Sequence, residues 1–388
     1  MLNTTFHTLV TEHGIGTQCK AQLVLRTNLE ELEPQLFLGI GFSPDGLLAR
    51  FAAEGELVER ATWMYGVLWN SASFSMHSIY LPDDVSLLFS KEHQKELQSV
   101  PSITFSAISS CGEELNIPAE AIFHYPKKRQ FLKHHSVTTG WAFHSSKKEA
   151  LAQGYREVIE RDLQMLFWFG RLSSFLYRLP STLLELWGEE YGISKKQLQS
   201  KTSELYLIQL GVKLHPSIGR HGYFTLAIVV SDKAPYLTVG SALKTSPKAS
   251  FSTAMGEMIM LRSYQYDLVL RAKRDDNEES YGVHVSQATY QTTMRDKTKK
   301  LLSTIETSLP SKRLAFTDKR LDYGTQNYQV SYFKPPPQTL KGVVAKVWVD
   351  NTQGMVPLGF EYILCSRWKD EWNVTQQEWD ANRWHPYP

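Results

Sequence analysis

The chain has 388 residues, of which 42% are hydrophobic and 21% are charged, so it can bury a sizeable core. Lys and Arg number 42 against 40 Asp and Glu, and the net charge of +2 gives no global reason to bind nucleic acid or an anionic membrane. No apolar run approaches the roughly 18 residues of a spanning helix, and the start MLNTTFHTLV lacks a signal-peptide pattern. We therefore expect neither export by a standard signal nor a membrane-embedded protein.

Helices and strands are mixed along the chain, which predicts the α/β (mixed α+β) class. Acid-bearing apolar stretches predict helices at about 46–66, 146–171 and 250–273. Runs of β-branched and aromatic residues predict strands at 205–214, 223–230, 236–243 and 343–349. The first two strands flank the turn-like HPSIGRHG and are expected to pair. The stretch FKPPPQTL at 333–340 is a predicted stiff connector.

The cysteines indicate the cellular compartment, and the basic runs bear on whether the protein binds nucleic acid. Cys19, Cys111 and Cys365 are odd in number and widely spaced, which fits neither a disulfide framework nor a zinc site, so a reducing cytoplasm is expected. The basic runs 127–135 and 294–300 are predicted solvated loops or helix faces. A nucleic-acid binder using 127–135 is a weaker alternative, because the run has no recognisable motif and only Phe131 as an interleaved aromatic residue.

One charged pattern occurs twice, as ELVER at 56–60 and EVIER at 157–161. At 100° per residue the acids of the second helix, Glu149, Glu157 and Glu160, lie within about 80° of one another, with Arg161 beside them. The opposite arc is apolar and is predicted to face the core. Because the first pentapeptide clusters its acids and arginine in the same way, the two helices are expected to converge on a common site.

Grouped carboxylates indicate a bound cation. They repel one another unless a cation lies between them, and Mg²⁺ prefers hard oxygen ligands. Neighbouring arginines can contact phosphate, so the pattern indicates Mg²⁺-nucleotide binding. No P-loop sequence occurs, and GIGFSPDG at 39–46 is only a lone Gly-rich turn. The alternative stays open that these are exposed ion pairs worth about 0.2–0.5 kcal/mol each, with Ser146 and Glu149 serving as a capping box.

Three segments resemble the motifs of the YcaO family. The segment at 138–170, TTGWAFHSSKKEALAQGYREVIERDLQMLFWFG, resembles the signature segment of that family. The family spacing S-x3-E-x7-E-x2-E-R is matched by Ser145, Glu149, Glu157, Glu160 and Arg161. GIGFSPDGLLARFAAEGELVER at 39–60 resembles the first family motif, and AMGEMIM, which contains Glu257, resembles the third.

The resemblance implies a YcaO fold whose Mg-ATP site is built from acidic helices without a P-loop. It implies a single YcaO domain at 1–388, with an N-terminal motif half at about 1–135, a core at about 136–330 and a C-terminal segment at about 331–388. ATP and Mg²⁺ are the implied cofactors. Metal contacts are implied for Glu56, Glu59, Glu149, Glu157 and Glu160. Nucleotide contacts are implied for Ser145, Arg60, Arg161 and Glu257.

Two residues depart from the family pattern. Ala52 stands where many members carry Ser, and Met260 stands where many carry Gln. These departures change the side chains that are implied to face a nucleotide. A weak or partner-dependent ATP site therefore remains an alternative interpretation.

The chain ends in RWHPYP at 383–388, which is similar to the proline-rich terminus of azoline-forming members. The resemblance therefore implies an azoline-forming cyclodehydratase of the stand-alone microcin B17 synthetase type. Such an enzyme uses ATP to convert Cys, Ser or Thr of a ribosomally made precursor peptide into thiazolines or oxazolines. The terminal carboxylate of Pro388 is the implied general base. A proline-spaced tail is stiff and can deliver its end to a fixed place.

The resemblance also implies partners. These are the precursor peptide, a separate ubiquitin-activating-like leader-binding protein and an FMN-dependent azoline dehydrogenase, with a homodimer expected inside a larger complex and no nucleic acid or membrane. Because the first motif begins near residue 39, no fused leader-binding domain is expected. Two alternatives remain: a thioamide or macroamidine synthase, and a non-catalytic scaffold in a synthetase complex. Ala52 and Met260 are the observations relevant to a scaffold, whereas the complete set of acids in the second motif favours an enzyme.

Overall fold

A computed structural model describes most of the chain. The described residues are 2–11, 14–25, 35–43, 45–70, 73–75, 102–123, 139–179, 185, 203–272, 292–305, 318–337, 339–353 and 364–382. The basic run 127–135 and the terminal stretch 383–388, with Pro388, lie outside them.

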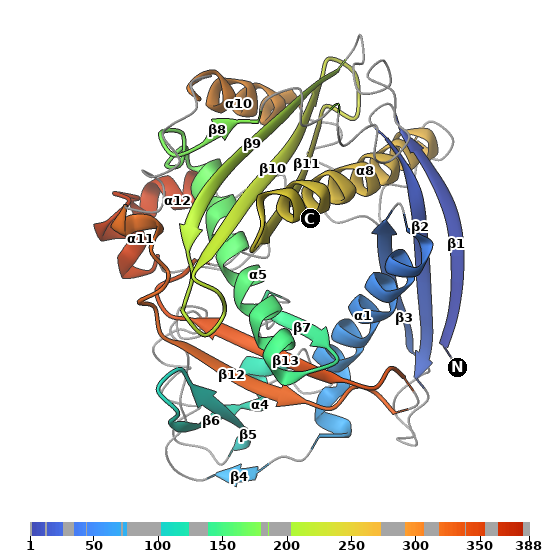
Figure 1. The fold of residues 1–388 in the computed structure, drawn as a ribbon, viewed down its shortest axis with the longest axis vertical. Coiled ribbons are helices and arrows are strands. Elements are labelled where there is room, and N and C mark those ends of the chain that lie inside the picture. Colours follow the sequence, from blue (N-terminus) through green and yellow to red (C-terminus); the bar gives the residue numbers. More distant parts are fainter. Residues whose placement is uncertain are drawn as a thin grey trace.

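The described strands form three sheets (Figure 1). The first has the order β1 (Leu2–Thr11), β2 (Gly14–Leu25) and β3 (Gln35–Ser43). The second has the order β11 (Leu237–Lys244), β10 (His221–Ser231), β9 (Ser203–Lys213) and β8 (Tyr177–Arg178). The third has the order β4 (Ser73–Ser75), β5 (Ser102–Ser109), β12 (Tyr328–Phe333), β13 (Val343–Val349) and β7 (Trp141–His144), with β6 (Glu114–Pro118) also paired to β5. In this order β3, β11 and β7 are edge strands.

Three long helices, α1 (Gly46–Tyr65), α5 (Lys147–Trp168) and α8 (Pro247–Ala272), lie around the middle of the molecule (Figure 1). The shorter helices are α4 (Ala119–Ile122), α10 (Thr292–Ser303), α11 (Ser366–Asp370) and α12 (Gln376–Asn382), and 3₁₀ turns span Gly66–Leu68 and Lys319–Leu321. All three predicted helices are confirmed within three residues. The basic run 294–300 lies in α10, so of the two predicted alternatives, a loop or a helix face, the structure shows the helix.

Side chains of the loop residue before each helix explain where α1 and α5 begin. Asp45 accepts a hydrogen bond from the Leu47 N–H at 2.8 Å. Ser146 accepts one from the Glu149 N–H at 3.3 Å, and its hydroxyl donates to the Glu149 carboxylate at 2.8 Å. These contacts satisfy N–H groups that a first helical turn leaves without partners. The predicted pairing of Ser146 with Glu149 is therefore confirmed, although Glu149 accepts from the hydroxyl.

The sheet formed by β8 to β11 is buried on both faces. Along β10, Leu226 and Ile228 pack with α5 in the largest core cluster, whereas Ala227 and Val229 pack with α8 in a second cluster. Successive side chains of a strand point to opposite faces, so burial on both faces requires the continuous apolar run that the sequence has here. The four predicted strands are confirmed, and β9 and β10 pair antiparallel as expected.

Glycines let two acid-bearing helices lie directly on edge strands. A Cβ atom on Gly41 of β3 would lie 2.0 Å from the Ala49 carbonyl oxygen of α1, and one on Gly240 of β11 would lie 2.3 Å from the Ala254 oxygen of α8. Only glycine permits such an approach. The interpretation of 39–46 as a Gly-rich turn is wrong for Gly39 and Gly41, because both belong to β3 and serve helix packing.

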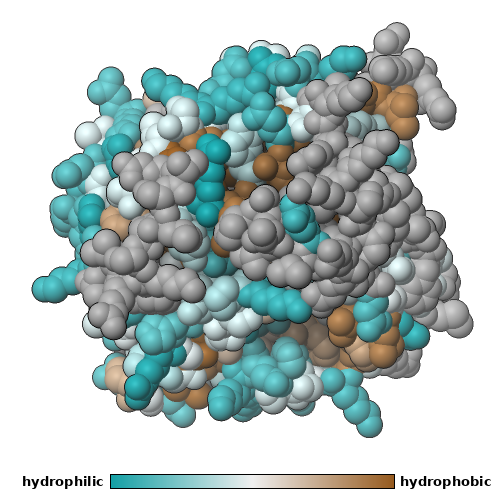
Figure 2. Space-filling model, turned by 45° about the horizontal axis from the view of Figure 1, so that its top comes forward, coloured by the Kyte–Doolittle hydropathy of each residue, from teal (hydrophilic) through white to brown (hydrophobic). Residues whose placement is uncertain are grey.

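On the face drawn in Figure 2, described hydrophilic and hydrophobic residues are intermixed. None of the described helices is both long and apolar enough to cross a membrane. Cys19 and Cys365 are buried and Cys111 is exposed, and all three are free thiols.

Candidate active site

Backbone N–H groups of the edge strands hold the predicted acids. The Ile40 N–H of β3 donates to Glu56 Oε2 at 2.5 Å, and the Phe143 N–H of β7 donates to Glu59 Oε1 at 2.6 Å. An edge strand leaves alternate N–H groups without a strand partner, and such groups need acceptors when they are buried. The two carboxylates of α1 therefore complete the edges of two different sheets through one oxygen each.

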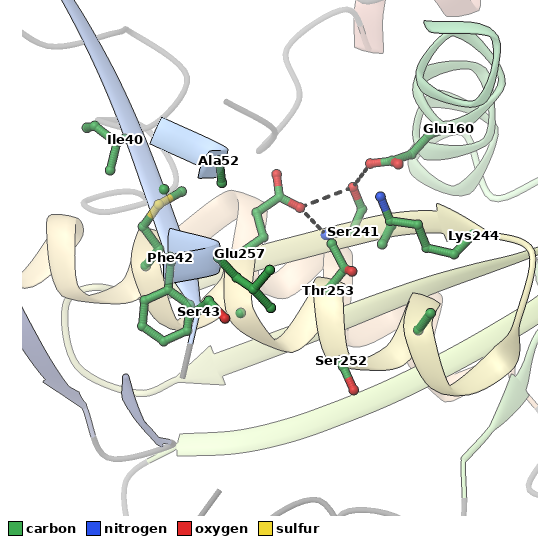
Figure 3. A pocket seen from close by; sticks show the side chains of 16 residues that line it. Ile40, Phe42, Ser43, Ala52, Glu160, Ser241, Lys244, Ser252, Thr253 and Glu257 are labelled. Carbon is green, nitrogen blue, oxygen red and sulfur yellow. Dashed lines mark hydrogen bonds between the residues drawn. The ribbon is translucent and has the colours of Figure 1, made fainter. Parts of the chain in front are cut away.

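Strand β11 joins the other two helices in the same way. Its Ser241 N–H donates to Glu257 Oε2 of α8 at 2.6 Å, and its Leu243 N–H donates to Glu160 Oε2 of α5 at 2.9 Å. The Ser241 hydroxyl also donates to Glu160 Oε1 at 2.5 Å. Figure 3 shows Ser241 between the two carboxylates. One edge strand thus brings together acids from two helices that are almost a hundred residues apart.

Electrostatic interactions link five acids from α1 through α5 to α8. Burial raises the pKa of Glu59 well above its ordinary value, and Glu157 and Glu56 raise it further. Burial raises the pKa of Glu157 to about 7, with a further contribution from Glu160. Burial and the neighbouring Glu160 likewise raise the pKa of Glu257 to about 7. Buried carboxylates of raised pKa in this row of acids, such as those of Glu59, Glu157 and Glu257, are stabilised in their ionised form by a bound cation.

Both predicted arginines lie beside this row. Arg60 forms a 2.6 Å ion pair with Glu56 and donates to the Leu38 carbonyl oxygen of β3 at 3.2 Å. Arg161 lies 4.0 Å from Glu157 and donates to Gln164 at 3.2 Å. Both guanidinium groups therefore compensate neighbouring carboxylates, and their contact with a nucleotide remains a prediction.

Ser145 and Glu149 form a separate group at the start of α5. Glu149 accepts hydrogen bonds from the hydroxyls of Ser146 at 2.8 Å and Ser145 at 3.1 Å, and these bonds lower its pKa. His144 Nδ1 lies 2.8 Å from the same carboxylate. Glu149 precedes Glu157 by two helical turns, or about 12 Å along the axis. The metal contact of Glu149 and the nucleotide contact of Ser145 remain predictions.

A pocket of about 490 Å³ adjoins the row of acids, between β3, β11 and the helices α1 and α8. Two predicted site residues, Glu160 and Glu257, line it. In Figure 3, Ile40, Phe42 and Ala52 lie on one side, Glu160, Ser241 and Lys244 lie on the other, and Glu257 lies between. Met260 also lines the pocket, so both departures from the family pattern face the same cavity. The pocket has the size of a small-molecule site with an apolar and a polar side.

The carboxylates of this row fit Mg²⁺ that is bound together with a nucleotide. No group of three or more His, Cys, Asp or Glu among the described residues forms a ready-made metal cage. Mg²⁺ usually takes one or two carboxylates and completes its shell with waters and substrate phosphates. Carboxylates of raised pKa beside a nucleotide-sized pocket satisfy this requirement, and the apolar side of the pocket suits a base.

Three residues that organise the site were not predicted from the sequence. Ser241 bonds Glu160 and Glu257, and Gln164 donates from its side chain to Ser241 while it accepts from Arg161. Lys244 lines the pocket at the end of the same strand. The strand itself was predicted, but no local signal identifies it as a sheet edge that faces two helices.

The YcaO family model, described as an ATP- and Mg²⁺-binding cyclodehydratase, matches residues 40–326. Three solved structures share the fold. YcaO from Methanopyrus kandleri bound with AMPPCP and Mg²⁺ is 15% identical, with a TM-score of 0.58 over 92% of this chain and 90% of that chain. The E. coli microcin synthetase McbBCD complex with pro-MccB17 bound is 14% identical, with a TM-score of 0.62 over 100% of this chain and 96% of that chain.

A heterocyclase in complex with substrate and cofactor is also 14% identical, with a TM-score of 0.62 over 97% of this chain and 54% of the heterocyclase. Identities this low establish the fold alone. A comparison with curated proteins gives no match.

Proposed function

The chain belongs to the YcaO family of ATP- and Mg²⁺-binding cyclodehydratases, and on this premise we propose that it forms azoline rings in a ribosomally made precursor peptide. The observation that carries the proposal is the row of five glutamates, four of which accept hydrogen bonds from N–H groups of the edge strands β3, β7 and β11, beside a pocket of about 490 Å³. A site of this kind binds a Mg²⁺-nucleotide without a P-loop.

In this proposal, different residues contact the metal and the nucleotide. We assign metal contacts to Glu56, Glu59, Glu149, Glu157 and Glu160. Arg60, Arg161, Ser145 and Glu257 lie nearer the nucleotide in this assignment. When bound, ATP supplies a phosphoryl group that makes a backbone amide oxygen a leaving group, and Mg²⁺ neutralises its charge. Because strand N–H groups orient the carboxylates beforehand, little reorganisation is needed on binding.

The ring closes on the peptide itself. The side-chain oxygen or sulfur of Ser, Thr or Cys bonds to the preceding carbonyl carbon and loses its proton. The former amide oxygen then leaves as phosphate, and loss of the amide proton completes the C=N bond. The terminal carboxylate of Pro388 is the proposed general base for these protons. This assignment rests on the resemblance of the HPYP terminus, which lies outside the described residues.

Partners follow from the same proposal. A precursor peptide needs to be presented to the site, and a separate ubiquitin-activating-like protein is the proposed leader-binding partner. An FMN-dependent dehydrogenase is the proposed enzyme that oxidises azolines to azoles. We place a homodimer of this chain, in the cytoplasm, within that complex.

Mass spectrometry of the precursor peptide tests the proposal. The peptide is incubated with Mg²⁺-ATP, this protein and the leader-binding partner, and parallel reactions contain Glu160→Gln or Glu257→Gln. Glu113→Gln, in the exposed turn after β5, is the matched control for loss of one carboxylate. We expect loss of one water per ring with the native protein and the control, and no mass change with the site variants.

A second comparison in the same experiment tests the proposed role of the C-terminal carboxylate of Pro388. A protein extended by one residue beyond Pro388 is compared with one extended at the N-terminus. Only the C-terminal extension is expected to abolish ring formation. Exchange of oxygen for sulfur would instead indicate a thioamide synthase, a single macrocyclic dehydration would indicate a macroamidine synthase, and an unchanged peptide in a stable complex would indicate a scaffold.

A further inference from the structure

Lys244 lines the pocket with a basic side chain, and it does not belong to the acidic motifs. It is the last residue of β11 and lines the cavity on the same side as Glu160 and Ser241. In Figure 3 its amino group points toward these two residues. We propose that Lys244 binds the phosphate groups of the nucleotide directly, alongside the phosphates' contacts with metal and arginine.

The electrostatic surroundings of Lys244 support this role. Burial lowers the pKa of Lys244 and Arg156 lowers it further, whereas Glu160, Glu257 and Glu157 favour its charged form. Yet its ammonium group forms no ion pair or hydrogen bond with any residue that the structure describes, although neighbouring Ser241 and Leu243 are both engaged with Glu160. A partly buried ammonium group is costly unless an anion approaches it. The pocket in front of Lys244 is where that anion would lie.

A Mg²⁺-nucleotide satisfies the lysine and the acids together. The glutamates favour a bound cation, and the ammonium group of Lys244, which makes no hydrogen bond or ion pair with the described residues, favours a bound anion, so a ligand that carries both charges suits this pocket wall. A nucleoside polyphosphate with bound Mg²⁺ carries both charges. The apolar side near Ile40 and Ala52 accepts its base.

The contribution of Lys244 should grow with the number of phosphates and should not depend on the base. A lysine acts as a compact point charge with three donors, so an arginine in its place retains the charge but alters the geometry. This inference rests on the proposed nucleotide site and specifies which described residue, besides the predicted arginines, contacts its phosphates.

Calorimetric titration of the full-length protein tests the inference. The probes are adenosine, Mg²⁺-ADP and the non-hydrolysable triphosphate Mg²⁺-AMPPCP. The variants are Lys244→Gln and Lys244→Arg, with Lys369→Gln on the exposed face of α11 as the control for loss of one positive charge. Thermal unfolding without ligand checks that every variant is folded.

We expect Lys244→Gln to weaken Mg²⁺-AMPPCP binding about 10- to 100-fold, as loss of a charge-assisted hydrogen bond predicts. Mg²⁺-ADP should be weakened less and adenosine unchanged, Lys244→Arg should restore part of the affinity, and Lys369→Gln should match the native protein. Equal binding by Lys244→Gln, or an equal loss for adenosine and the triphosphate, would overturn the role of Lys244.

The native protein separates this inference from the proposed function. If it binds Mg²⁺-AMPPCP and only the phosphate-dependent loss is missing, the role of Lys244 fails and the nucleotide site stands. If the native protein binds none of the three probes, the nucleotide site itself is refuted, and the role of Lys244 with it.

Discussion

Asp162 and Arg367 form a buried ion pair of 2.9 Å that joins α5 to α11, and their side chains are 0% and 3% exposed. Asp162 also accepts hydrogen bonds from Tyr323 Oη at 2.7 Å, Trp368 Nε1 at 2.8 Å and the Gln353 N–H at 2.8 Å. Four donors from the C-terminal third of the chain thus meet one carboxylate. Because Asp162 directly follows the acid motif of α5, this cluster couples the site helix to the segment that precedes the C-terminal tail.

Removing the charge of Asp162 should destabilise the fold strongly. In Asp162→Asn, Arg367 would remain buried without its anion, and we expect the free energy of unfolding to fall by about 3–5 kcal/mol. Urea denaturation measures the change. The double variant Asp162→Asn/Arg367→Met removes the stranded charge and should be more stable than Asp162→Asn alone. A double variant no more stable than the single one would show that the ion pair is not the source of the loss.

The metal-free protein should lose stability as pH rises toward 7. The pKa values of Glu157 and Glu257 are about 7 in the folded state, above the ordinary 4.5. Between these limits the folded state binds more protons than the unfolded state, so the free energy of unfolding falls with increasing pH. We expect a fall on the order of 5 kcal/mol between pH 5 and pH 7.5 from the two groups together. Thermal unfolding in EDTA at several pH values measures it.

Matched variants identify the groups responsible for this pH dependence. Glu157→Gln should unfold with a shallower dependence on pH in the same window, because it lacks one titrating group. Glu113→Gln, at an exposed position, should retain the native dependence. Identical slopes for all three proteins would refute the assignment of the titration to the buried acids.

Close packing of α1 on β3 should tolerate no side chain at position 41. Gly41→Ala would place a Cβ atom 2.0 Å from the Ala49 carbonyl oxygen, and overpacking of this kind costs about 1–3 kcal/mol. Gly55→Ala is the matched control, because its Cβ would meet Phe143 at an ordinary 3.8 Å. Inside a helix it should be neutral or stabilising by up to about 1 kcal/mol. Chemical denaturation of both variants checks the contrast, and equal losses would contradict the packing argument.

Polar substitution on the apolar side of the pocket should strengthen nucleotide binding. Met260 lines this cavity where many family members carry Gln. Met260→Gln provides a hydrogen-bonding group for the base or ribose, and we expect about 2- to 10-fold tighter binding of both adenosine and Mg²⁺-AMPPCP. Met260→Leu keeps the position apolar and should bind as the native protein does. Calorimetry with the two ligands measures the effect, and unchanged or weaker binding by Met260→Gln would contradict the gain of a hydrogen bond at this position.

Local sequence patterns sufficed for the three long helices and for the four predicted strands. The starts of α1 and α5 follow from apolar periodicity and from the capping residues Asp45 and Ser146, each of which accepts from a backbone N–H only two or three residues further along the chain. The grouping of Glu157 with Glu160 likewise follows from helical geometry alone. These features depend on short-range contacts, so a single sequence contains the information.

Only the tertiary structure decided which strands are edges and which acids they hold. The first sheet, which contains β3, was not anticipated from the sequence, and Gly41 was therefore interpreted as part of a turn. Ser241 and Lys244 gain their roles because β11 ends a sheet between α5 and α8. Strand order depends on pairing between distant segments, and no local pattern encodes which N–H groups such pairing leaves for a carboxylate.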